Sequence, residues 1–136
     1  MTKARMAAFL ISSVALAGAA GGASAASDGG GDWRQFSREA NGDVHYFDAS
    51  RVKRTDRVRQ VWSRIRYKTS VMGASSYQSL LELDCAERTV RILQNTFFSD
   101  RRWERPAMNT DKTAKPKRSI PTGSAAERLA ATLCDQ

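Results

Sequence analysis

Three stretches of the chain have the patterns of half-buried β-strands. In residues 57–68 apolar and charged positions alternate with a period of two. One face carries Val61, Ser63, Ile65 and Tyr67, and the other carries Gln60, Trp62, Arg64, Arg66 and Lys68. Residues 77–85 repeat the alternation with two leucines and Cys85 on one face, and residues 89–98 are rich in β-branched and aromatic side chains. The connections are too short for crossovers, so the pattern predicts an antiparallel sheet.

Shorter elements flank these three strands. Residues 33–48 indicate two short strands around an Asn41-Gly42 turn. A short edge strand is expected near Trp103. Residues 106–118 contain proline and lysine and show no apolar period, so we expect a mobile loop there.

A C-terminal helix is predicted after Pro121 and Gly123. Ser124 stands three residues before Glu127, which is the spacing of a capping box, in which each side chain accepts from the other residue's backbone N–H. Small and apolar side chains then recur at helical spacing, at Ala125, Ala126, Leu129, Ala130 and Leu133. A helix of about three turns is marginal alone in water, so this stripe must pack on the sheet.

The first 25 residues have the features of a secretory signal peptide. Two basic residues precede an apolar run over residues 6–17, and small residues follow up to Ala25. The run is shorter than the ~20 residues that a membrane-spanning helix needs. We therefore expect a signal peptide at 1–25, a flexible glycine-rich leader at 26–32 and one domain at 33–136. The mature protein should be exported to the periplasm, or further to the cell surface or medium.

Two cysteines, Cys85 and Cys134, are the only ones in the sequence. In an oxidising compartment such a pair usually forms a disulfide, the alternative being two free buried thiols. Closing this loop would destabilise the unfolded chain by roughly 4 kcal/mol. The predicted fold is therefore α+β: an antiparallel sheet of about five or six strands with one C-terminal helix tethered to it by a disulfide.

The chain is basic, with 22 Lys and Arg against 14 Asp and Glu and a formal net charge of +8. Residues 51–68 hold eight basic side chains and one acidic side chain, and residues 101–118 hold seven and two. Concentrated positive charge favours anionic partners without specifying which anion is bound.

Four segments together resemble a known family. They are VHYFDASRV, VRQVW, ELDCAERTVRI and IPTGSAAERLAATLC, which lie between Trp33 and Cys134. Their order and spacing resemble the surface-adhesin protein E-like domain of Gram-negative bacteria. The resemblance implies a bent antiparallel sheet with the helix tethered across its concave face, and attachment to host extracellular-matrix proteins. It supplies no motif-matched ligand residues.

The sequence offers no catalytic residue, no metal ligand set and no cofactor motif. His45 is the only histidine, and a catalytic role would need a nucleophile and an orienting group beside it. We interpret it as a half-exposed strand residue. Asp48 is interpreted as a turn or cap residue that bonds its own backbone, against the alternative of a functional carboxylate. The protein is therefore predicted not to be an enzyme.

The candidate binding surface for an anionic partner lies on the basic strand predicted over residues 57–68. Its residues are Arg59, Trp62, Arg64, Arg66 and Lys68. Arginine suits planar carboxylate, sulfate or phosphate groups, and tryptophan anchors interfaces. A plain solvated sheet face remains the alternative for the charges, and core packing remains the alternative for Trp33, Trp62 and Trp103.

Two functions follow from these observations. The first is a non-enzymatic, adhesin-like binding module, using this surface and the 106–118 loop, for a host matrix protein or for an anionic glycan such as a sulfated glycan or lipopolysaccharide. The second is a periplasmic structural or assembly accessory that contacts the envelope or another protein. Nucleic acid is disfavoured as a partner because an exported protein seldom meets it. An exposed sheet edge can pair with the edge of a second copy, so the sequence is also compatible with a homodimer.

Overall fold

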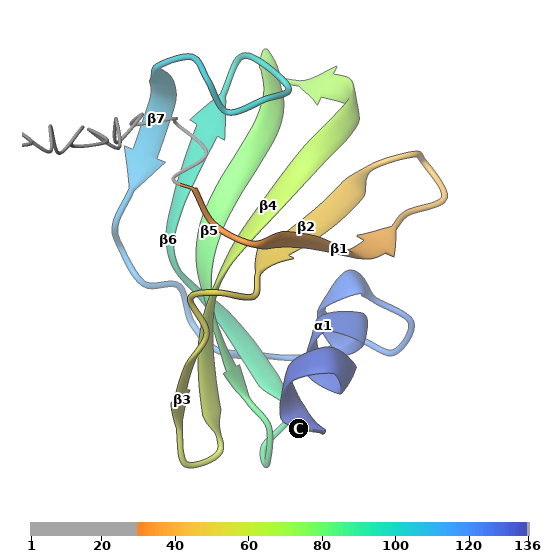
Figure 1. The fold of residues 1–136 in the computed structure, drawn as a ribbon, viewed down its shortest axis with the longest axis vertical. Helices are drawn as coiled ribbons and strands as arrows, with labels where there is room; N and C mark the ends of the chain where they lie inside the picture. The colour runs from red at the N-terminus through yellow and green to blue at the C-terminus, as the bar shows by residue number, and fades with distance from the viewer. Residues whose placement is uncertain (1–29, 136) are drawn as a thin grey trace, which may run out of the picture.

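The computed structural model describes residues 30–135, so the predicted signal peptide lies outside the described residues. They form one antiparallel sheet and one helix (Figure 1). The strands in chain order are β1 (Trp33–Arg38), β2 (Val44–Asp48), β3 (Lys53–Thr55), β4 (Val58–Val71), β5 (Ala74–Asp84), β6 (Thr89–Phe98), β7 (Ala107–Asp111) and β8 (Arg118–Ser119). The spatial order is β1-β2-β4-β5-β6-β7, with β3 paired to β4 and β8 paired to β6. The predicted fold class is confirmed, with two short strands added to a path of six.

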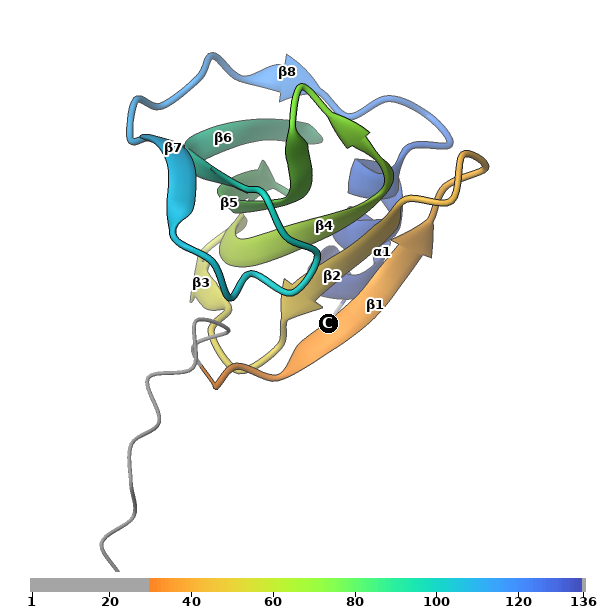
Figure 2. The ribbon, with the colours of Figure 1, turned by 90° about the horizontal axis from the view of Figure 1, so that it is seen from above.

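The three long strands lie where their patterns placed them, and all their pairings are antiparallel. Val61 on β4 faces Leu81 on β5, and Ile65 faces Tyr77. Because register and alternation agree, the apolar positions of both strands lie on one face of the sheet. The strands curl strongly, as the view from above shows (Figure 2).

The outer strands differ in part from expectation. The hairpin of β1 and β2 turns at residues 39–43, where Gly42 has a φ of 95°, as predicted. The strand expected near Trp103 is absent, since the Asp100 carboxylate accepts the backbone N–H groups of Arg102 and Glu104 and folds that segment into a turn. The edge strand β7 instead lies within the segment that was expected to be a loop.

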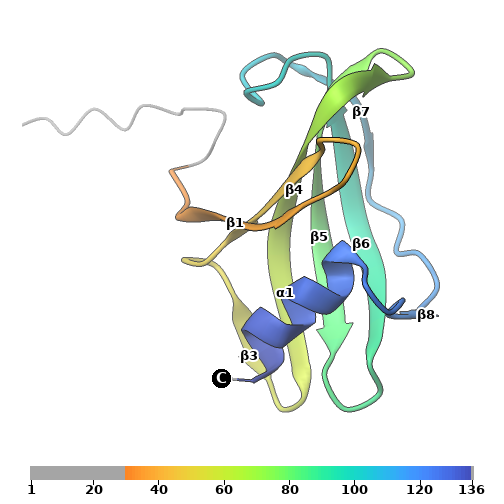
Figure 3. The same ribbon diagram turned by 90° about the vertical axis from the view of Figure 1, so that its right-hand side faces the viewer.

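The helix α1 (Ala125–Cys134) lies across one face of the curved sheet (Figure 3). Ser124 is its N-cap and accepts the backbone N–H of Glu127 at 3.2 Å. The second half of the predicted capping box is not formed, because the Ser124 N–H donates to the Pro121 carbonyl. The buried core joins helix and sheet through Phe47, Val61, Leu83, Val90, Leu129 and Leu133.

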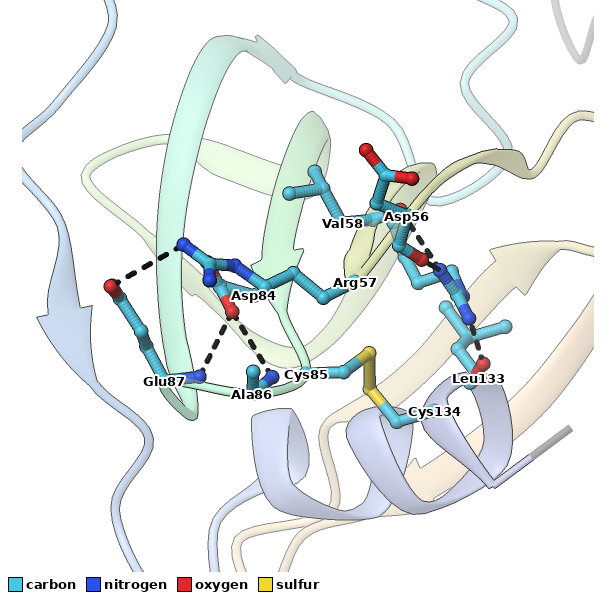
Figure 4. Close-up of a disulfide and its surroundings, with 10 residues drawn as sticks. Asp56, Arg57, Val58, Asp84, Cys85, Ala86, Glu87, Leu133 and Cys134 are labelled. Carbon is cyan, nitrogen blue, oxygen red and sulfur yellow. Dashed lines mark hydrogen bonds and ion pairs between the residues drawn. A yellow bond between two sulfur atoms is a disulfide. The ribbon is translucent and has the colours of Figure 1, made fainter.

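The disulfide joins Cys85, just after β5, to the last turn of α1 (Figure 4). The two Cα atoms are 5.5 Å apart, and residues 30–135 contain no free cysteine. Beside the disulfide, the guanidinium of Arg59 donates to the Leu133 carbonyl at 3.2 Å and to the Asp56 carbonyl at 2.8 Å. A covalent bond and a buried cation therefore both hold the helix end.

Candidate anion-binding site

A surface hollow of about 340 Å³ lies on the sheet face that points away from α1. Aromatic and basic side chains dominate its lining, which consists of Trp33, Tyr46, Arg64, Arg66, Arg101, Arg102, Trp103 and Glu104. They come from β1, β2, β4 and the loop between β6 and β7. We call this the aromatic hollow. Sequence alternation explains part of it, because Arg64 and Arg66 are two positions apart on β4 and so share a face.

Arg64 forms the floor of the aromatic hollow. Its guanidinium carbon lies 4.1 Å from the ring centre of Trp33 and 4.7 Å from that of Trp103. Its Nε donates to the Gln78 side chain at 2.8 Å, and the residue is only 3% exposed. A guanidinium between two indoles is held by attraction between the cation and the ring faces, which strengthens as water is excluded. Arg64 thus keeps a positive charge beneath the surface in a fixed place.

The wall of the aromatic hollow is fixed by hydrogen bonds. Trp103 donates its indole N–H to the Tyr77 carbonyl at 3.2 Å and is mostly buried, with a positive φ of 57°. Its ring meets Tyr46 edge to face at 6.2 Å. Arg66 donates to the Tyr46 hydroxyl at 2.6 Å. The aromatic rings and the Arg66 guanidinium are therefore positioned before any ligand arrives.

A second hollow of about 340 Å³ adjoins the first and shares three arginines with it. Its lining consists of Arg38, Gly42, Val44, Arg66, Lys68, Arg101 and Arg102. We call this the basic hollow. No carboxylate among residues 30–135 forms an ion pair with Arg38, Lys68, Arg101 or Arg102. The two hollows together present six basic side chains and one acidic side chain, Glu104.

The structure brings together three of the five residues of the predicted binding surface. Arg64, Arg66 and Lys68 line the two hollows. Trp62 is half-buried on the same face, where the Arg51 guanidinium lies 5.8 Å from its ring centre. Arg59 lies on the opposite face, bonded to the end of α1, and is 9% exposed.

Residues outside β4 complete the site, and sequence reasoning did not assign them. Tyr46, Arg101 and Arg102 line the aromatic hollow, and Arg38 lines the basic one. The basic cluster that begins at residue 101 was a usable signal. It could not be joined to β4 without knowing that the 99–106 loop lies over β2 and β4.

Other charged residues have structural roles. Asp48 is fully buried and accepts hydrogen bonds from the backbone N–H groups of Asp32 and Ser50, as well as from the Arg51 side chain. Its bond to Ser50 is the turn interaction expected from the sequence. Burial alone would raise the pKa of this carboxyl, but the hydrogen bonds from Ser50 and Arg51 hold its pKa below the ordinary value.

His45 is half-buried in β2, with the Phe36 ring edge-on at 5.7 Å. Burial lowers the pKa of its imidazole. Within residues 30–135, no group of three His, Cys, Asp or Glu side chains is placed to hold a metal ion. No helix in that part of the chain is long and apolar enough to cross a membrane.

The fold defines a class of small α+β domains in which a curved antiparallel sheet carries one disulfide-linked helix. Two solved structures of Haemophilus influenzae protein E are similar to this chain in fold. Crystal form II has a TM-score of 0.62 and 12% identity, covering 76% of this chain and 87% of that one. The other has a TM-score of 0.59 and 13% identity, covering 76% and 83%.

The family model of surface-adhesin protein E matches residues 33–135, so the chain belongs to that family. The resemblance seen in the sequence is confirmed. Membership of a family of surface adhesins implies export. A search of curated proteins finds no match.

Proposed function

We propose that this protein is an exported, non-enzymatic binding module that holds anionic groups of its partner in the two hollows. The observation that carries the proposal is the charge of the lining, six basic side chains against Glu104. Positive side chains on a shared concave surface raise the local concentration of anions and speed their encounter. Export and a binding role are in keeping with the adhesin family.

The chemistry of the lining specifies more than charge. Arg66, Arg101 and Arg102 offer planar donor groups that match carboxylate, sulfate or phosphate oxygens. The indole and phenol rings beside them offer apolar contact to a flat portion of the ligand. Glu104 accepts hydrogen bonds, which suits a partner that also carries hydroxyl or amide donors. Acidic proteins and anionic glycans of the host matrix both meet these requirements.

An electrostatic test uses immobilised heparin as a polyanionic probe. We expect binding that weakens steeply between about 50 and 300 mM salt, because salt screens exposed charges. Arg66→Glu with Arg102→Glu should abolish binding. Lys53→Glu with Lys112→Glu makes the same change in net charge away from the hollows and should retain most of it. Equal losses for the two pairs, or binding indifferent to salt, would contradict the proposal.

The adhesin role and the periplasmic accessory role separate by location. If the protein acts as an adhesin, an impermeant label applied to intact cells should reach exposed lysines such as Lys53, while a known periplasmic protein stays unlabelled. Protection of both proteins would instead favour the accessory role. The anion-binding proposal is independent of this outcome, because both locations hold anionic partners.

A further inference from the structure

The exposed large apolar side chains of residues 30–135 gather at one end of the molecule. They are Val71, Met72 and Met108, exposed by 49%, 98% and 50%. Single apolar side chains scattered over a surface are ordinary, whereas a group at one place points to an interaction. The turn between β4 and β5, which carries Met72 and directly follows Val71, lies at the end of the sheet away from α1 (Figures 1 and 3).

The backbone makes this group of apolar side chains protrude from the sheet. Val71 pairs with Ala74 across the turn, and Met72 and Gly73 form the turn itself with φ values of 50° and 82°. From β7, the Met108 methyl group lies 3.6 Å from where a Cβ on Gly73 would stand. The three side chains thus form one small projection from two strands. We call it the apolar tip.

Positive charge surrounds the base of the apolar tip. Residues 67–77 contain no acidic residue, and Lys68 lies three positions before Val71, about 10 Å along the strand. The 99–106 loop, at the same end of the sheet in Figure 1, supplies Arg101, Arg102 and Arg105. The carboxylate of Asp100 in this loop is taken up by three backbone N–H groups. Three further acidic residues are Asp43, which accepts the Lys68 backbone N–H, Glu104 in the loop, and Glu39, which lies beside Asp43 and is paired with Arg128.

We propose that the apolar tip inserts into the surface of an anionic lipid bilayer while the surrounding basic side chains contact its headgroups. A protein partner would need about 800 Å² of complementary surface on each side, and three side chains on a convex projection supply only a fraction of that. A lipid surface deforms around a projection, and methionine adapts to irregular apolar surroundings. Apolar insertion combined with basic residues is the usual basis of reversible membrane binding.

Only the contact of the basic side chains with lipid headgroups rests on the proposed function, because the apolar tip lies outside both hollows. The test is sedimentation with vesicles of phosphatidylcholine containing about 30% phosphatidylglycerol. Met72→Asn with Met108→Thr should bind these vesicles about tenfold more weakly, since each apolar side chain adds to the affinity. Asparagine tolerates the positive φ at position 72, and threonine suits a strand.

Heparin binding is measured on the same variant and should be unchanged. Lys53→Gln at the far end of the sheet serves as the control and should bind vesicles as the wild type does. A fluorophore sensitive to polarity, attached to Met72→Cys, should become brighter on anionic vesicles, and the same label on Lys53→Cys should not. Equal vesicle binding by the tip variant and the wild type would overturn the inference.

The remaining outcomes distinguish the two proposals. Heparin binding without vesicle binding overturns the membrane inference and leaves the proposed function standing. The tip variant could lose vesicle binding while Arg66→Glu with Arg102→Glu retains it. This result supports insertion of the apolar tip and contradicts a role for the hollows in vesicle binding. Strong capture of a protein by the apolar tip with no vesicle binding would also overturn the inference.

Discussion

The guanidinium carbon of Arg64 lies 4.1 Å from the ring centre of Trp33, and Trp103 flanks it at 4.7 Å. The three residues come from β4, from β1 and from the loop after β6, so this stack connects the first strand to a loop about 70 positions later. Sequence alternation places Arg64 on the charged outer face of the sheet. In the folded chain its guanidinium packs against two indoles on that face.

Replacing Arg64 by methionine should lower the free energy of unfolding by roughly 2–4 kcal/mol, because two ring contacts and the bond to Gln78 are lost. Arg64→Lys should recover little of this free energy, since an ammonium group cannot stack on the rings as a planar guanidinium does. Urea denaturation followed by circular dichroism measures both. Lys68→Met, on the same strand but exposed, is the control and should change stability by less than about 0.5 kcal/mol. Similar losses for Arg64→Met and Lys68→Met would show that the stack contributes nothing.

Removing the disulfide should destabilise the protein by roughly 4 kcal/mol on the chain-entropy estimate. Cys85→Ser with Cys134→Ser and chemical reduction of the wild type should give matching urea midpoints, both lower than that of the oxidised protein. An unchanged midpoint in both cases would mean that core packing alone holds α1 in place.

Arg59 should matter to the helix more than to ligand binding. It donates to the carbonyls of Leu133, Asp56 and Val58, so Arg59→Met leaves these groups unpaired and should lower the free energy of unfolding by about 1–3 kcal/mol. Hydrogen exchange should show faster opening of the last turn of α1. Heparin affinity should stay within about twofold of the wild type. A large loss of affinity with native stability would place Arg59 in the binding surface after all.

Stability should fall in acid partly through Asp48. The pKa of its carboxyl is held below the ordinary value of 3.8, so the ionised form stabilises the fold above that pH. This contribution is lost as the pH falls from 3.8 through the folded-state pKa. Asp48→Asn should therefore be less stable than the wild type near pH 7, and the difference should shrink near pH 2. A difference that is constant with pH would show that only shape matters at this position.

Alternation along the chain was sufficient to predict the central sheet. In β4 to β6 each strand alternates or is β-rich, and each pairs with its neighbour through a short turn, so local pattern and long-range structure coincide. The helix and its disulfide were predictable for a related reason. Ser124, the leucine stripe and Cys134 are close in sequence, and only one other cysteine was present as a partner for Cys134.

The anion-binding site was predictable only in part. Arg66 and Lys68 could be placed on one face because they share β4. Arg101 and Arg102 reach that face because Asp100 folds the loop back, and no period in the sequence encodes this. The strand β7 was missed because its residues are nearly all exposed and therefore have no apolar alternation.

The two indoles that contact Arg64 provide an intrinsic fluorescence signal for ligand binding. Trp33 and Trp103 both line the aromatic hollow, where a newly arrived anion would change the electric field across their rings. Their emission maximum should therefore shift when the hollow fills, whereas Trp62, which does not line the aromatic hollow, should provide a steadier background. Anion binding to the aromatic hollow can thus be followed by the tryptophan fluorescence of the unlabelled protein.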